Sequence, residues 1–129
     1  MPTARTPEEL LQLITQNFSA HDVEGAVALY EPNATLAHQP GQVVTGTEAI
    51  REALGGLLGM RPNFNLKVNK VFQAHDVALI FSDWSISATA PDGNAVEMAG
   101  QGSDVARRQA DGSWLMVIDN PWGGEHGFL

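Results

Sequence analysis

Between residues 6 and 58 the chain places apolar side chains three and four positions apart, the spacing of helices with one buried face. In the segment TPEELLQLITQNFSA, Thr6 is the predicted N-cap, Pro7 opens the helix and Glu9 completes a capping box. The stripe that this first helix would bury consists of Leu10, Leu11, Ile14 and Phe18.

Two more helices and a short strand are predicted before the pattern changes. Asp22 is the expected N-cap of a second helix that runs to Tyr30, where a nearby proline stops it within a turn. The segment ATLAH, residues 34–38, is predicted to be a strand, and a turn rich in proline and glycine follows it. Thr47 is the expected cap of a third helix over residues 48–58.

From residue 64 onward apolar and polar residues alternate, which is the pattern of strands with one buried face. The predicted strands cover residues 64–69, 77–90, 95–108 and 114–120. The turns PDGN and ADGS join the last three into an antiparallel meander. Gly100 and Gly102 are interpreted as a bend or bulge inside one long strand. Helices first and strands after predict an α+β fold, with N-terminal helices packed on one face of a curved antiparallel sheet.

Composition narrows the class of protein. A chain of 129 residues with 43% hydrophobic content fits one domain over residues 1–129. The formal charge of -8 repels phosphate backbones and anionic lipids, so we expect neither a nucleic-acid nor a membrane partner. The absence of cysteine excludes disulfides and thiolate chemistry, and the sequence shows no signal-peptide pattern. We therefore expect a cytoplasmic protein.

Three motifs carry a family resemblance: AHDVEGAVALYEPNATL, GTEAIREAL and DVARRQADGSWLMVIDNPWG. Together they resemble the nuclear transport factor two-like superfamily in its SnoaL-like and SgcJ/EcaC-type branch, from about residue 7 to residue 123. The resemblance implies a cone-shaped fold with a hydrophobic pocket open at one end, and a homodimer formed through the open face of the sheet. Because the superfamily includes ketosteroid isomerases, polyketide cyclases, dehydratases and modules that only bind, the resemblance does not imply one activity.

His38 is the first candidate for chemistry. It falls on the same strand face as Ala34 and Leu36, so its ring is expected to point into the interior. Along the distantly similar ketosteroid isomerase pattern, His38 occupies the position of the catalytic aspartate base. An imidazole can take a proton from carbon next to a carbonyl. The alternative is a pocket-lining histidine that hydrogen-bonds a backbone carbonyl or a ligand.

Asp104 is the second catalytic candidate. The motif GSDVARR aligns it with the isomerase acid that donates a hydrogen bond to the developing enolate. That role needs a carboxyl kept protonated by apolar neighbours, which Val96 and Met98 on the same strand face could provide.

Two other arrangements of this segment stay open. A slip of one residue in the register would turn Ser103 inward in place of Asp104. Asp104 could also pair with Arg107, with Arg108 or with a lysine on the neighbouring strand. The isomerase tyrosine that completes the oxyanion site is missing, because its place in the first helix falls near Ile14.

The closing segment VIDNPWGG supplies candidate ligand-binding residues at the rim of the cone. Asn120 is expected to orient a ligand, and Trp122 to lie across the mouth. Trp84 and Met98 are expected to line the pocket as well. Alternatively, Asp119 and Asn120 cap a turn, Trp122 packs on the first helix or on a partner subunit, and Trp84 belongs to the core.

The four histidines, at positions 21, 38, 75 and 126, show no metal-binding spacing, so we expect neither metal nor cofactor. Two functions follow from these residues. The first is a small-molecule-binding protein that acts as a proton-abstracting isomerase, cyclase or lyase on an apolar carbonyl compound. The second is a non-catalytic binding or dimerisation module, and the sequence leaves open whether the protein is an enzyme.

Overall fold

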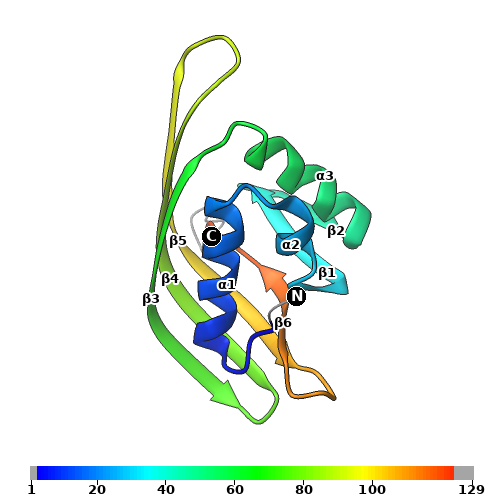
Figure 1. Ribbon diagram of the computed structural model, residues 1–129. Coiled ribbons are helices and arrows are strands. Elements are labelled where there is room, and N and C mark those ends of the chain that lie inside the picture. Colours follow the sequence, from blue (N-terminus) through cyan, green and yellow to red (C-terminus); the bar gives the residue numbers. More distant parts are fainter. Residues whose placement is uncertain (1–2, 124–129) are drawn as a thin grey trace.

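The described part of the chain, residues 3–123 of a computed structural model, contains three helices in its first half and a run of four strands in its second half (Figure 1). Its elements are α1 (Pro7–Ser19), α2 (Val23–Val27), β1 (Tyr30–Gln39), β2 (Gln42–Thr45), α3 (Thr47–Leu58), β3 (Asn63–Ala74), β4 (Val77–Thr89), β5 (Ala95–Arg108) and β6 (Trp114–Asp119). The strands form one sheet in the order β2-β1-β6-β5-β4-β3. Neighbouring strands are antiparallel except β1 and β6, which run parallel. The α+β prediction and the antiparallel meander are confirmed.

The helices all lie on one side of the sheet. In Figure 1 the sheet curves around α1, while α2 and α3 stand beside it, next to β1 and β2. The hairpin of β4 and β5 extends well beyond the helices at the top of the view. Among residues 3–123, only the inner face of the sheet is covered by helices, and the opposite face is left uncovered. Within the described residues, the helices are all too short or too polar to cross a bilayer.

Local capping explains where the helices begin. Thr6 accepts a hydrogen bond from the Glu9 amide at 3.1 Å, as predicted, but the Glu9 carboxylate accepts from the Arg5 amide at 2.6 Å instead of closing the box on Thr6. Asp22 accepts from the Gly25 amide at 2.9 Å and caps α2. The predicted cap of α3 is wrong by one residue: the N-cap is the glycine before Thr47, and no side chain caps this helix.

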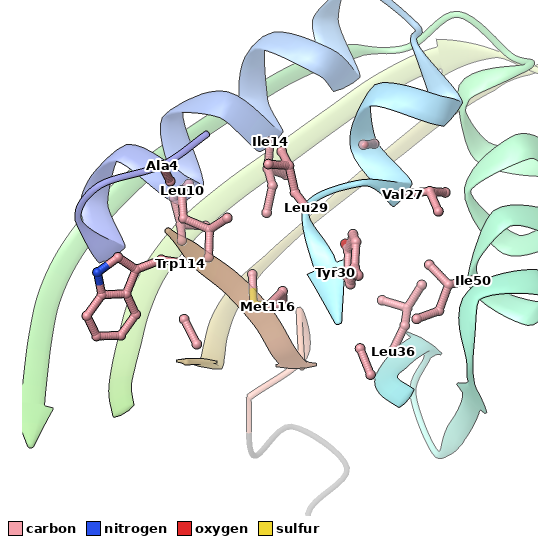
Figure 2. Close-up of a cluster of buried hydrophobic side chains, with 14 of the residues drawn as sticks. Ala4, Leu10, Ile14, Val27, Leu29, Tyr30, Leu36, Ile50, Trp114 and Met116 are labelled. Atoms are coloured by element: carbon pink, nitrogen blue, oxygen red, sulfur yellow. The ribbon is translucent and has the colours of Figure 1, made fainter. Parts of the chain in front are cut away.

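The hydrophobic core lies between α1, α3 and the inner face of the sheet (Figure 2). Trp114 and Met116 on β6 are both 1% exposed. The Trp114 amide donates to the Ala4 carbonyl at 2.9 Å, which ties the segment before α1 to this strand. Figure 2 shows the Trp114 ring beneath the start of α1 and Met116 nearer to β1. The last strand of the chain, β6, therefore lies at the centre of the core.

Gly100 and Gly102 do not mark a bulge between β4 and β5. The pairing of these strands is continuous from Val77 with Arg107 to the far end of the hairpin. A Cβ on Gly100 would lie 3.0 Å from the Trp84 ring and 3.1 Å from a backbone oxygen of the segment after β6. The glycine is there because an indole and a second backbone approach the strand closely.

The strand β1 starts earlier than the pattern predicted. The helix expected to reach Tyr30 ends at Val27, and Tyr30 is the first residue of β1, paired with Met116 of β6. Leu36 of β1 is paired with Asp119 of the same strand. This parallel pairing places residues 30–36 of β1 alongside β6.

Candidate functional site

A cavity of about 820 Å³ lies between the helices and the inner face of the sheet. Most of its wall is apolar and comes from α1, α3 and the sheet; examples are Ile14, Phe18, Leu57, Phe64, Ile86 and Met116. Its exposed lining residues mark the mouth and come from the end of β1, the β1–β2 turn and α3; they are Gln39, Pro40, Glu52 and Gly56. The size and the apolar wall suit a small organic molecule.

Two carboxyl groups on adjacent strands meet at the polar side of this cavity. Asp104 on β5 is 4% exposed, Asp119 at the end of β6 is half-buried, and both line the cavity. The two carboxyls lie close enough to raise and lower each other's pKa, and they can hydrogen-bond to each other when one of them carries a proton. The Asn120 amide donates to Asp104 Oδ1 at 2.9 Å, and the Tyr30 hydroxyl donates to Asp119 Oδ2 at 2.5 Å. Tyr30, Asp119 and Asp104 thus form one hydrogen-bonded chain.

Burial dominates the protonation of this chain. It raises the pKa of Asp104 well above its usual value, and the neighbouring Asp119 raises it further. Burial also raises the pKa of Asp119, but the hydrogen bonds from Tyr30 and from Asp104 act in the opposite direction. The pKa of the Tyr30 hydroxyl is raised well above its usual value by burial and by the charge of Asp119. The pair therefore loses its first proton from Asp119 and keeps the second on Asp104.

The register question at Asp104 has a definite answer. Asp104 faces the cavity and is paired with Ile80, whereas Ser103 is paired with Phe81 on the outer face and does not line the cavity. The basic neighbours are engaged elsewhere, because Arg107 binds Glu31 at 2.8 Å and Arg108 binds Asp76 at 2.7 Å. Asp104 is therefore paired with Asp119 and not with an arginine.

His38 near the end of β1 also lines the cavity. Its Nδ1 is buried, and within the described residues no protein group hydrogen-bonds to it. A buried polar atom without a partner costs about 1–3 kcal/mol, so this nitrogen is suited to a ligand atom. His38, Asp104 and Asp119 do not cluster closely enough to hold a metal ion, nor does any other group of acidic or histidine residues in positions 3–123.

The aromatic residues at the closing segment lie as a pair. Trp84 and Trp122 both line the cavity, edge to face with ring centroids 5.2 Å apart. The Trp84 indole donates to the Pro121 carbonyl at 2.6 Å, and the Trp122 indole donates to the Ala37 carbonyl at 3.0 Å. Their contacts hold the segment after β6 against β4 and β1. Met98 also lines the cavity, from β5.

Asn120 lies differently from the other candidates. Its carboxamide donates to Ser103 Oγ at 3.2 Å and to the Gly123 carbonyl at 2.9 Å, and the residue does not line the cavity. Only its backbone amide reaches the site, through the bond to Asp104. The carboxamide of Asn120 thus stabilises the turn after β6, and its backbone amide holds the Asp104 carboxyl in place.

The sequence pattern did not identify the role of Tyr30, because it predicted this residue at the end of a helix. It gave Asp119 as a residue that caps a turn. Their hydrogen bond joins residues 89 positions apart. One local signal was present: Tyr30 stands directly before Glu31 and Pro32, and a proline so near restricts continuation of the helix. A strand starting there would have turned the tyrosine inward.

Comparisons with known proteins agree with this geometry. The family model described as SnoaL-like domain matches residues 10–116. A ketosteroid isomerase-like protein from Erwinia carotovora atroseptica superposes with a TM-score of 0.76 at 20% identity, covering 87% of this chain and 88% of that one. A candidate dehydratase of the NTF2-like family from Streptomyces avermitilis gives 0.73 at 17% identity, with 86% and 89% covered.

A third similar structure is a candidate calcium/calmodulin-dependent protein kinase type II association domain from Thiobacillus denitrificans, with a TM-score of 0.76, 20% identity and 93% and 96% covered. The search of curated proteins gives no significant match. The structure has the NTF2-like fold, as the resemblance implied. The chain belongs to the SnoaL-like domain family.

Proposed function

We propose that the protein binds a small apolar carbonyl compound in this cavity and transfers a proton at the carbon next to the carbonyl. The observation that carries this proposal is the apolar cavity of about 820 Å³ with His38 and the Asp104–Asp119 pair on its wall. Similar structures named as isomerase-like and as a candidate dehydratase support the class of chemistry. The apolar wall would strengthen each polar contact with the ligand, because little water competes for it.

In this proposal Asp104 and His38 have separate roles. When the ligand binds, the protonated Asp104 carboxyl turns its single O–H from Asp119 to the carbonyl oxygen of the ligand. The His38 imidazole takes the proton from the adjacent carbon, the C–H electron pair forms a carbon–carbon double bond, and the carbonyl π pair moves onto oxygen. In a ligand with a further carbon–carbon double bond in conjugation with this enolate, return of the proton from His38 to the far carbon re-forms the carbonyl and yields an isomer. In a ligand with a leaving group on the next carbon, the oxygen pair re-forms the carbonyl, the double bond moves to that carbon, and the group departs with its bonding pair to yield a lyase product.

Binding is tested with 2-acetylnaphthalene, an apolar ketone that needs no knowledge of the natural ligand. Ligand addition should shift the ring resonances of His38 in an NMR spectrum and leave those of His75 unchanged, because His75 is exposed in the β3–β4 turn. Equal shifts at both histidines, or none, would contradict a ligand site in the cavity.

Catalysis is tested by exchange of the ketone's methyl protons in D₂O. The wild-type protein should accelerate the exchange, and His38→Ala should reduce the acceleration at least about 100-fold, since general-base groups contribute on this scale. The matched control is His75→Asn, which changes an exposed histidine at a position with φ 54° that asparagine tolerates. Binding without exchange would leave a binding protein and contradict the proposed catalysis.

A second candidate function, association of two copies, is favoured by the uncovered face of the sheet. Phe72, Leu79, Val105 and Ile118 are partners in one register row across β3, β4, β5 and β6. Phe72 is 53% exposed and Ile118 43% exposed. Contiguous exposed apolar side chains are typical of protein interfaces.

We propose a homodimer through this row, and the similar structure named as an association domain supports it. Leu79→Glu should then give a monomeric mass in light scattering at micromolar concentration. The control is Val43→Glu, which places the same charge at an exposed apolar residue of β2 outside the row. A monomeric wild-type protein would refute the homodimer.

A further inference from the structure

The titratable groups on the described cavity wall are three carboxyls and one imidazole. Asp104 and Asp119 lie at its polar side, Glu52 of α3 lies at its mouth, and His38 lies near the end of β1, but the described lining residues include no lysine or arginine. The arginines nearest in sequence to Asp104 bind Glu31 and Asp76 instead. No permanently positive side chain of the described wall is therefore available to neutralise an anionic ligand.

The two carboxyls of the pair differ in their surroundings. Each carboxyl receives one hydrogen bond from outside the pair, Asp119 from the Tyr30 hydroxyl at 2.5 Å and Asp104 from the Asn120 amide at 2.9 Å. They differ in burial, because Asp119 is half-buried and Asp104 is 4% exposed. The less buried carboxyl holds a charge at lower cost, so the charge belongs on Asp119 and the shared proton on Asp104. Tyr30 does not line the cavity and is 6% exposed, so it acts on the ligand only through Asp119. It is a positioning residue.

We propose that Asp119 sets the charge specificity of the cavity, so that the ligand is an uncharged hydrogen-bond acceptor and carboxylates and phosphates are rejected. This inference rests on the proposed function, because it assumes that a small molecule occupies the cavity. An anionic group placed beside Asp104 would also lie beside the Asp119 charge in a site of low polarity, where repulsion is strong. A neutral carbonyl meets only the proton of Asp104.

The inference is tested with three probes that share a 2-naphthyl group: 2-acetylnaphthalene, 2-naphthoate and 2-naphthylmethylammonium. Calorimetry at pH 7 should show the ketone binding at least about 10-fold more tightly than 2-naphthoate, a difference of about 1.4 kcal/mol. Equal binding of the carboxylate would overturn the inference and leave the proposed function intact. Tighter binding of the ammonium than of the ketone would overturn it in favour of a cation site. If none of the probes binds, the proposed function fails together with the inference.

Variants separate Asp119 from the general reluctance of anions to enter an apolar cavity. Asp119→Asn should reduce the ratio of the dissociation constants of 2-naphthoate and of the ketone at least about 10-fold. Glu52→Gln removes the same charge from the mouth of the same cavity and should leave the ratio unchanged. Equal effects of the two variants would contradict a specific role for Asp119. If Asp119→Asn does not fold, the order of the three probes on the wild-type protein still decides whether the cavity rejects anions, and Tyr30→Phe then tests the part played by Asp119.

Tyr30→Phe tests the positioning role through a pH profile. Without the hydroxyl, the Asp119 carboxylate loses a donor, so its ionisation should move to higher pH in the ¹³C resonances of the carboxyl groups. Tyr30 from β1 and Asp104 from β5 interact with Asp119 directly, and the other titratable groups on the described wall of the same cavity are His38 from β1 and Glu52 from α3. An unchanged Asp119 titration in this variant would show that Tyr30 is only a packing residue.

Discussion

Gly100→Ala is expected to destabilise the protein even though it adds a single methyl group. The new Cβ would lie 3.0 Å from Trp84 Cζ2 and 3.1 Å from the Pro121 oxygen. Neither neighbour can yield alone, because the Trp84 indole donates to that same Pro121 oxygen at 2.6 Å. The substitution must therefore push apart two groups that are hydrogen-bonded to each other.

The expected loss can be worked from these contacts. Overpacking costs about 1–3 kcal/mol, and a weakened hydrogen bond costs about 1 kcal/mol. Loss of glycine's freedom in the unfolded chain returns about 0.4–1 kcal/mol. The free energy of unfolding should fall by about 1–3.6 kcal/mol in total.

The assay is urea unfolding followed by far-ultraviolet circular dichroism, since the fluorescence of Trp84 would itself change. The matched control is Gly55→Ala in α3, where a Cβ meets nothing within 4 Å. That variant should gain about 0.5–1 kcal/mol, because alanine favours a helix interior. If Gly100→Ala were as stable as wild type, the close approach of Trp84 and Pro121 to β5 would be refuted.

Three further substitutions test the same structure. The pKa of Asp104 is higher in the folded state than in the unfolded chain, so the stability of the wild-type protein should fall as the pH rises above the unfolded pKa. Asp104→Asn lacks this titration, so its stability relative to wild type should increase with pH. Parallel pH curves of the two proteins in urea unfolding would contradict this. Trp114→Ala should lose about 3–5 kcal/mol in the same assay, because it empties a core site. Asp22→Ala should lose about 0.5–2 kcal/mol by removing the cap on the Gly25 amide, and Asp22→Asn should recover most of the loss.

The sequence predicted those features that depend on neighbouring residues. Thr6 and Asp22 cap helices because a side chain reaches an amide three positions on. The inward direction of Asp104 followed from strand alternation. The predicted N-cap of α3 was wrong by one residue. The chain enters α3 at Gly46 with φ 95°, a conformation that favours glycine, but the hydroxyl of Thr47 is the stronger capping signal in the sequence.

The site was predicted only in part, for a related reason. The pattern could place His38 and Asp104 on inward faces, but it could not show that β1 and β6 are parallel neighbours. That single pairing brings the Tyr30 hydroxyl to Asp119 and makes Asp119 the partner of Asp104. The order of the strands depends on how the whole sheet packs, and the spacing of residues within one segment does not show which strands become neighbours.

The same strand that completes the core also completes the site. Trp114 and Met116 of β6 are buried against the helices, and Asp119 ends that strand beside Asp104. A buried carboxyl pair with raised pKa values lowers the stability of the fold at neutral pH, because the folded state must hold a proton that the unfolded chain releases. Since an apolar pair of similar volume would avoid this cost, the carboxyls do not serve stability. The apolar part of β6 stabilises the sheet that holds them, so the position of the two carboxyls depends on the docking of this last strand between β1 and β5.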